Sequence, residues 1–256
     1  MTTYVLTFVY GLLVGSFLNV CIHRLPRRES LWSPRSRCPA CRTPIAVRDN
    51  IPLFSYLWLK GRCRSCQAPI SPRYPLIEVA NGLGWVLILW RFGFDWSSAV
   101  YALLFSALLA VSFIDLEHLI VPDLITLPGI VLGFLCAATV LPVGWIDSML
   151  GILVGGGLLW GLAWISPYVF GKEGMGGGDI KLLAMIGAFL GWQPTLLTVM
   201  VGAVLGSVVG ISLIAAKVMQ RDQYLPFGPF LALGALFSLF FHHELLDWYF
   251  GLMSGV

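Results

Sequence analysis

Long apolar runs, interrupted by short polar segments, form the main pattern of hydrophobic and polar positions along this chain. Most of the runs carry no charged residue. A helix needs about 20 mainly apolar residues to cross a hydrocarbon core that is about 30 Å thick. The pattern therefore predicts eight membrane-spanning helices, over residues 4–22, 74–90, 96–114, 124–141, 148–169, 180–192, 195–216 and 225–241.

The count of eight depends on the stretch from Leu182 to Ala216, which has 35 residues without a charge. As a single helix it would be longer than about 50 Å, too long for one crossing. The sequence Gly191-Trp192-Gln193-Pro194 lies inside it and predicts a break, because glycine and proline interrupt helices. The sixth span, 180–192, then has only 13 residues, and we expect it to be unusually short.

Composition supports a membrane protein. Of the 256 residues, 58% are hydrophobic and 11% are charged. A typical soluble domain has about 25% charged residues, so this chain has too few charges to cover a soluble globule. Disorder is excluded as well, because disordered chains combine low hydrophobicity with high charge.

The cations are concentrated between His23 and Arg73, where eleven Lys and Arg residues face two acids. A basic block could bind nucleic acid, but in a membrane protein it typically marks a cytoplasmic loop. We therefore expect no nucleic-acid partner. Eight spans with this loop in the cytoplasm place fifteen of the sixteen Lys and Arg residues on the cytoplasmic side, Arg91 being the exception. The predicted domains are a first transmembrane helix over 1–22, a cytoplasmic zinc-binding domain over 23–73 and a seven-helix membrane catalytic domain over 74–256.

Four cysteines in the basic loop form two Cys-x-x-Cys pairs, Cys38 with Cys41 and Cys63 with Cys66. The pairs are separated by 21 residues, a spacing that suits tetrahedral thiolate coordination of zinc. Two disulfides or a redox pair are the alternatives, and a cytoplasmic location disfavours structural disulfides. Four thiolates leave no open coordination position, so the predicted zinc is structural. We see no convincing internal repeat in the chain.

Two aspartates are candidates for chemistry at the cytoplasmic membrane edge. Asp115 ends the third predicted span, and Asp179 opens the sixth after Gly176-Gly177-Gly178. Carboxylates at membrane depth are costly and suggest function. Because the sixth span is short, we expect Asp179 below the headgroups, with the glycine run as non-helical backbone that is buried or lines a wet cavity.

Two nearby carboxyls can share one proton, because like charges at close range cannot easily both ionise. The ionised one can take a proton from water while the neutral one donates to a scissile carbonyl, which is aspartic protease chemistry. The structural alternative is that Asp179 caps its helix and Asp115 lies at the interface. Asp123 is expected to start a helix, and Glu78 to pair with an arginine or line a cavity. Lys181 is expected to change the proton affinity of Asp179 or to contact phospholipid.

Two other functions fit these features. Acidic residues at membrane depth and a broken helix also occur in transporters and channels. A zinc-stapled assembly platform without chemistry of its own is the second alternative.

The chain resembles the bacterial type IV prepilin peptidases, also called type II secretion leader peptidases. The resemblance covers nearly the whole chain. Gly176-Gly177-Gly178-Asp179-Ile180-Lys181 fits the GxGD-x-K box of that family. Five further segments match in the same order, namely 15–26, the paired Cys-x-x-Cys loop, 73–78, 115–123 and 226–232.

This resemblance implies an all-α polytopic membrane protein with about eight transmembrane helices and a small zinc-knuckle cytoplasmic loop domain. It implies a multi-pass protein of the bacterial inner membrane and an aspartic endopeptidase with Asp115 and Asp179 as the catalytic pair. The expected partners are prepilins or pseudopilins, cut after a glycine, and membrane lipid. Many members also methylate the new N-terminal amine with S-adenosylmethionine, whose site the resemblance does not locate.

Overall fold

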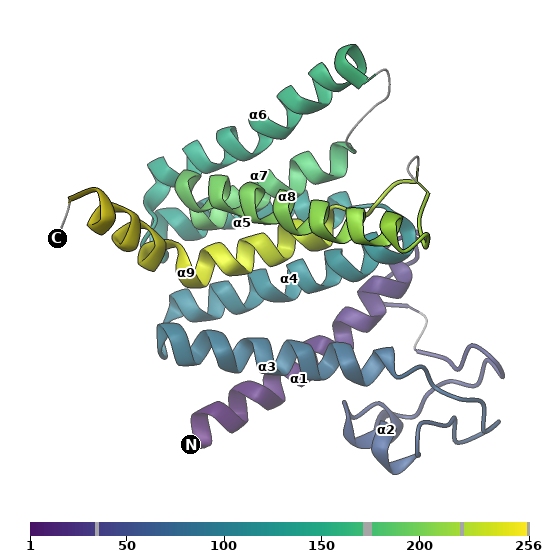
Figure 1. The fold of residues 1–256 in the computed structure, drawn as a ribbon. Coiled ribbons are helices and arrows are strands. Elements are labelled where there is room, and N and C mark those ends of the chain that lie inside the picture. The colour runs from purple at the N-terminus through teal and green to yellow at the C-terminus, as the bar shows by residue number, and fades with distance from the viewer. Residues whose placement is uncertain (34–35, 171–175, 221–222, 255–256) are drawn as a thin grey trace. The chain divides into compact units, whose positions relative to one another are not determined.

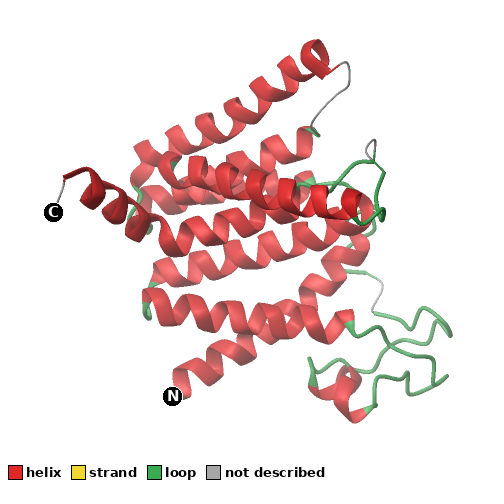
Figure 2. Ribbon diagram, viewed as in Figure 1, coloured by secondary structure: helices red, strands yellow, loops and turns green. Residues whose placement is uncertain are grey.

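Helices and connecting loops make up the computed structural model, which describes residues 1–33, 36–170, 176–220 and 223–254. Figure 2 shows helices joined by loops, with no strand in these described ranges. The elements, labelled in Figure 1, are α1 (Thr2–Arg24), η1 (Val47–Asp49), α2 (Phe54–Trp58), α3 (Arg73–Phe92), α4 (Trp96–His118), α5 (Asp123–Thr139), α6 (Gly144–Phe170), α7 (Gly177–Leu190), α8 (Trp192–Ala215) and α9 (Gly228–Ser254).

Each of the eight predicted spans overlaps one helix, and the all-α fold class is confirmed. Within the described residues, α1, α4, α6, α8 and α9 are long and apolar enough to cross a membrane. The other three, α3, α5 and α7, do not meet that standard of length and composition. The number of eight crossings therefore stays a prediction.

The chain forms two compact units, Met1–Ala110 and Val111–Val256, with the boundary inside α4. The division into 1–22, 23–73 and 74–256 stays a prediction. The two units are described separately below.

In the first unit, α1 packs closely against α3 through small residues. A Cβ atom at Gly11 would lie 2.7 Å from the Cα atom of Gly82, and one at Gly15 would lie 2.7 Å from the Cα atom of Glu78. Small residues allow helix backbones to approach in this way, which is how helices associate where lipid removes the hydrophobic driving force.

A buried polar network joins the helices of the first unit. The Asn81 amide nitrogen donates to the Gly11 carbonyl at 2.7 Å, and the Ser106 hydroxyl donates to the Asn81 amide oxygen at 2.8 Å. The Trp85 indole donates in turn to the Ser106 hydroxyl at 2.9 Å. Buried polar groups that are paired in this way avoid the cost of an unmade hydrogen bond.

In the second unit, the short helix α7 is enclosed by its neighbours. It contacts α5, α6, α8 and α9, and every residue from Leu182 to Leu190 is buried. The closest approach is between α7 and α6, where Gly187 and Gly151 face each other backbone to backbone. The 14 residues of α7 confirm that this helix is short, and its burial in protein removes its apolar side chains from lipid.

The break between α7 and α8 lies at one residue, Gly191. Its φ of +83° belongs to a region that glycine adopts without strain. The helix α8 begins directly at Trp192, so Pro194 lies in the first helical turn, where its missing N–H removes no helical bond. The predicted break is confirmed, but the expectation that it extends to Pro194 is wrong.

Candidate catalytic and metal sites

Asp115 lies in the last turn of α4 and is buried, with 5% of its surface exposed. Its Oδ2 atom accepts a hydrogen bond from the backbone N–H of Gly228 at 2.8 Å. Gly228 is the first residue of α9, so the start of one helix holds the carboxylate at the end of another. A carboxylate held at such a helix start has a favourable place for negative charge.

Asp179 is the third residue of α7 and is half-buried. The residue that caps α7 is Gly176, so the alternative in which Asp179 is the helix cap is wrong. The charge of Asp115 acts on the Asp179 carboxyl, although 64 residues separate the two in sequence. Both predicted aspartates lie in the second unit, near enough for this electrostatic influence.

The glycine run before Asp179 is mostly helical, which corrects the expectation of non-helical backbone there. Gly177 and Gly178 belong to the first turn of α7, and only Gly176 has an extended conformation. A Cβ atom at Gly178 would lie 2.8 Å from the Cβ atom of Val121, whereas one at Gly177 would meet open space. Gly178 thus allows the start of α7 to lie against the segment that follows α4. That contact holds the first turn of α7, to which Asp179 belongs. Residues 171–175 of the predicted connection lie outside the described residues.

Lys181 and Asp123 form an ion pair, with 2.6 Å between Nζ and Oδ1. Asp123 is the first residue of α5, which confirms the expected helix start, and the pair connects the starts of α5 and α7. Lys181 was expected to tune Asp179 or to contact phospholipid. Its partner in the structure is a different carboxylate.

Sequence reasoning missed the contact between Gly228 and Asp115. Pro226 and Pro229 around a glycine indicate a helix start, because proline is favoured in a first turn. That pattern does not tell which side chain the start of the helix faces. Only the packing of α9 in the second unit supplies this information.

The four predicted zinc ligands lie together in the first unit. The Sγ atoms of Cys38, Cys41, Cys63 and Cys66 are all within 4.8 Å of one another, and 3.8 Å separates those of Cys38 and Cys66. Zinc–sulfur bonds of about 2.3 Å in a tetrahedron require sulfurs about 3.8 Å apart. The donor set therefore fits a zinc ion with four thiolate ligands.

The two cysteine pairs fold into the same turn twice, and the view that the chain contains no repeat is wrong at this scale. The sequences Arg-Cys-Pro-Ala-Cys-Arg-Thr-Pro-Ile and Arg-Cys-Arg-Ser-Cys-Gln-Ala-Pro-Ile are related by a shift of 25 positions. Arg42 and Gln67, at equivalent positions, both have a φ of +60°. Each turn makes the same three backbone hydrogen bonds. In the first turn the N–H of Cys38 donates to the Thr43 carbonyl, that of Arg42 to Cys38, and that of Ile45 to Ser36. In the second turn the N–H of Cys63 donates to the Ala68 carbonyl, that of Gln67 to Cys63, and that of Ile70 to Gly61.

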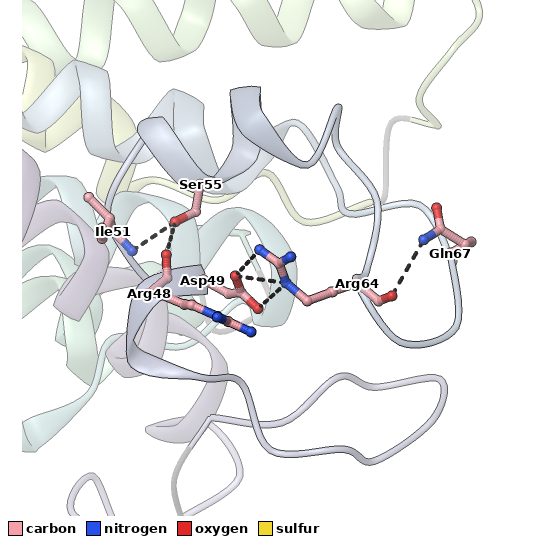
Figure 3. Close-up of polar contacts among 6 residues, drawn as sticks. All are labelled: Arg48, Asp49, Ile51, Ser55, Arg64 and Gln67. Atoms are coloured by element: carbon pink, nitrogen blue, oxygen red, sulfur yellow. Dashed lines mark hydrogen bonds and ion pairs between the residues drawn. The ribbon is translucent and has the colours of Figure 1, made fainter.

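Polar contacts stabilise the segment between the two turns (Figure 3). The Asp49 carboxylate accepts hydrogen bonds from the Arg64 guanidinium, the shortest at 2.6 Å. These bonds favour the ionised form and hold the pKa of Asp49 below its usual value. The Ser55 hydroxyl donates to the Arg48 carbonyl and accepts from the Ile51 N–H, each at 3.0 Å. The chain between the cysteine pairs is thus held by side chains.

Glu78, on α3, is anchored to this segment. Its Oε2 atom accepts the N–H of Leu53 at 2.8 Å, and Leu53 is the residue that caps α2, with a φ of +59°. An arginine or a cavity was the expected surrounding of Glu78. Its partners in the structure are the Leu53 backbone N–H and the Ser16 side chain, and the first connects a buried position of α3 to the cysteine-containing segment.

Comparison with protein families gives two matches, which cover successive parts of the chain. The Bacterial Peptidase A24 N-terminal domain matches residues 9–92, and the Type IV leader peptidase family matches residues 102–211. A relative from Aeromonas salmonicida (strain A449) is 39% identical over 95% of this chain and 92% of its own length. The chain belongs to the type IV leader peptidase family.

Further members of the family have similar identity. A relative from Stutzerimonas stutzeri is 42% identical over 90% of this chain and 88% of its own length. One from Pseudomonas aeruginosa is 39% identical over 95% of this chain and 92% of its own length. All three relatives are named prepilin leader peptidase/N-methyltransferase. No solved structure matches the chain.

The two family matches divide the candidate sites between them. All four cysteines lie within 9–92, the part that matches the N-terminal domain. Asp115 and Asp179 both lie within 102–211, the part that matches the leader peptidase family itself. Gly228 lies beyond that match, so this contact to Asp115 is a feature that the structure adds.

Proposed function

We propose that this chain is a membrane aspartic endopeptidase that removes the leader peptide of type IV prepilins and pseudopilins, with Asp115 and Asp179 as its catalytic pair. The observation that carries the proposal is that Asp115, at the end of α4, lies near enough to Asp179, at the start of α7, for its charge to act on that carboxyl. The names of the relatives support the substrate class.

Hydrolysis needs one carboxyl in each protonation state. The ionised carboxylate takes a proton from water, and the water oxygen forms a bond to the scissile carbonyl carbon. At the same time the protonated carboxyl gives its proton to the carbonyl oxygen, which yields a neutral diol. The first carboxyl then passes its proton to the leaving nitrogen as the C–N bond breaks. A diol hydroxyl returns a proton to the second carboxyl, so both groups end as they began.

Membrane topology supports a substrate cut at the cytoplasmic face of the inner membrane. Positively charged loops remain in the cytoplasm, and the segment between His23 and Arg73 is strongly basic. The eight-span arrangement puts Asp115 and Asp179 on that same side. The polar leader of a prepilin would lie at this surface while its apolar helix stays in lipid.

The cysteine quartet is proposed to hold a structural zinc ion in the cytoplasmic loop. A segment with few buried side chains gains folding free energy from such an ion, because the metal binds only the folded arrangement. Four thiolates leave no coordination position for a substrate. The zinc is therefore assigned to the shape of the loop and not to peptide cleavage.

Methylation of the new N-terminal amine is the second proposed activity, with S-adenosylmethionine as the methyl donor. The relatives' names support the activity. In the first unit a groove of about 640 Å³ is lined by apolar side chains of α1, α3 and α4, Tyr4, Leu87, Trp90 and Phe105 among them. It offers no charged or amide side chain for the polar parts of this donor. It does not fit, and we assign no residue to the donor.

The test is reconstitution of the purified protein with a full-length prepilin and an isotopically labelled methyl donor, followed by mass spectrometry of the pilin. We expect two separate mass changes, loss of the leader and addition of one labelled methyl group. A prepilin with alanine for the glycine before the cut is the matched control and should stay intact. An uncleaved wild-type prepilin, with the enzyme folded in its membrane, would contradict the proposal.

A further inference from the structure

The first turn of α9 has a single backbone donor that points away from its own helix. The N–H groups of Phe230 and Leu231 both donate to the Phe227 carbonyl at 3.1 Å, and Pro229 has no N–H. The N–H of Gly228 is left, and it donates to Asp115 Oδ2 at 2.8 Å.

The glycine at this position is required by the side chain that it contacts. A Cβ atom on residue 228 would lie 2.8 Å from Asp115 Oδ2 and 3.3 Å from its Cγ atom. Any other residue would push the carboxylate away from the N–H. The Asp115 oxygen that accepts the hydrogen bond therefore also occupies the space that a side chain at position 228 would need.

The surroundings of Asp179 differ. Among the residues that the structure describes, its carboxylate receives no hydrogen bond, and the charge that acts on it is that of Asp115. The one cation nearby on α7, Lys181, is paired with Asp123 of α5. On α4, Glu117 and His118 contact each other at 3.9 Å.

Helix ends act on both carboxyls. The start of α7 favours a negative charge on Asp179, and the last carbonyls of α4 disfavour one on Asp115. Gly228 offsets the second effect directly, because a donor within hydrogen-bond distance of a carboxylate stabilises its ionised form specifically. When the pair shares one proton, this direct donor favours Asp115 as the carboxyl that carries the negative charge.

We propose that the catalytic pair is asymmetric, with Asp115 as the ionised base that activates water, Asp179 as the proton donor to the scissile carbonyl, and Gly228 as the positioning residue that holds Asp115 in its role. This assignment rests on the proposed peptidase function. It adds which carboxyl performs which step, and it places the start of α9 in the catalytic arrangement.

The experiment replaces Gly228 by glycolic acid during cell-free synthesis of the full chain in lipid nanodiscs. The resulting ester has an oxygen in place of the N–H and adds no side chain. We expect kcat for leader cleavage to fall about tenfold or more at neutral pH, the size expected for a lost hydrogen bond to a charged group. The acidic limb of the pH profile of kcat should move about one pH unit upward, because the ionised base becomes harder to populate.

Leu233, further along α9, provides the control when it is replaced by its hydroxy-acid analogue. The control loses one helical N–H away from Asp115, so its acidic limb should stay where the wild-type limb is. If the ester at 228 leaves both kcat and the acidic limb of its pH profile at their wild-type values, the assignment is overturned. Gly228→Ala, with Gly251→Ala in the same helix as control, is the second variant, and it should show the same upward movement of the limb.

Failure of the assignment can be told from failure of the peptidase function. If Asp115→Asn protein is inactive while the ester at 228 behaves as wild type, the pair is catalytic but Gly228 does not set its asymmetry. If Asp115→Asn protein cleaves normally, the peptidase proposal itself is wrong. If the acidic limb of the kcat profile moves by the same amount in the esters at 228 and 233, the assignment is also overturned. The shift would then come from weakening of α9 and not from loss of the hydrogen bond to Asp115.

Discussion

The cysteine quartet and the aspartate pair are built in opposite ways. The outermost of the four cysteines are 28 positions apart in one segment, and each turn is closed by backbone hydrogen bonds between residues a few positions apart. The two aspartates come from separate helices, and the packing of α7, α9 and the segment after α4 brings them into place. We therefore expect assembly of the first site to depend on its proposed metal, and assembly of the second to depend on a packed helix bundle.

A large effect is expected from loss of a cysteine ligand. Cys38→Ser should reduce bound zinc from about one ion per chain to almost none, because a structural zinc site needs its full set of thiolates. Elemental analysis of the purified protein measures this directly. Limited proteolysis should show faster cutting between residues 36 and 70, since the metal supplies the folding free energy of that segment.

The matched control for this change is Cys136→Ser, in α5, which should keep its zinc. Zinc content that is the same in Cys38→Ser and wild-type protein would show that the four sulfurs do not form one metal site. The cysteine quartet and the aspartate pair would then no longer differ in whether a metal is needed to assemble the site.

A smaller effect is expected at the packing contact that places Asp179. Gly178→Ala puts a Cβ atom 2.8 Å from that of Val121, so the start of α7 must shift. Overpacking of this kind costs about 1–3 kcal/mol, and a displacement near 1 Å at a catalytic group can lower a rate about a hundredfold. Initial rates of leader cleavage at saturating prepilin should therefore fall by about ten- to a hundredfold.

Gly177→Ala tests whether the effect depends on position. The new Cβ atom there faces open space, so cleavage should remain near the wild-type rate. Equal rates for the two variants, whether both high or both low, would show that the contact with Val121 does not position Asp179.

The smallest effect is expected at the ion pair of Lys181 and Asp123. Both side chains are partly exposed, and exposed pairs contribute only about 0.2–1 kcal/mol. Asp123→Asn should therefore change the cleavage rate by less than about fivefold. The exchange of both residues, Asp123→Lys with Lys181→Asp, should return the rate toward wild type. A loss of several hundredfold in Asp123→Asn would give this carboxylate a role in the chemistry.

The features that could be predicted from the sequence are those that local pattern determines. Hydropathy predicted the eight helices that overlap the expected spans. Spacing predicted the cysteine quartet, because two cysteines with two residues between them in a tight turn can face one ion. Even here the repeated turn was missed, since the two segments share few side chains beyond Cys, Pro and Ile. The shared sequence Arg-Cys-x-x-Cys-x-x-Pro-Ile was the available signal.

Features that depend on contacts between helices could not be predicted. The aspartates were found as costly charges at membrane depth, but the hydrogen bond from Gly228 joins positions 113 residues apart and has no local signal. The conformation of Gly177 and Gly178 was predicted wrongly because a glycine run usually favours a loop. In the structure Gly178 is needed for close packing against Val121 within a helix.

One measurement tests the central claim most directly, namely the mass of a prepilin after incubation with purified Asp115→Asn protein and, separately, with Asp179→Asn protein. Asp147→Asn, the same change in α6, serves as the control. The account predicts that both catalytic variants leave the leader attached, at rates at least about a thousandfold below wild type, while the control cleaves normally. Leader removal at the wild-type rate by either catalytic variant would contradict the account.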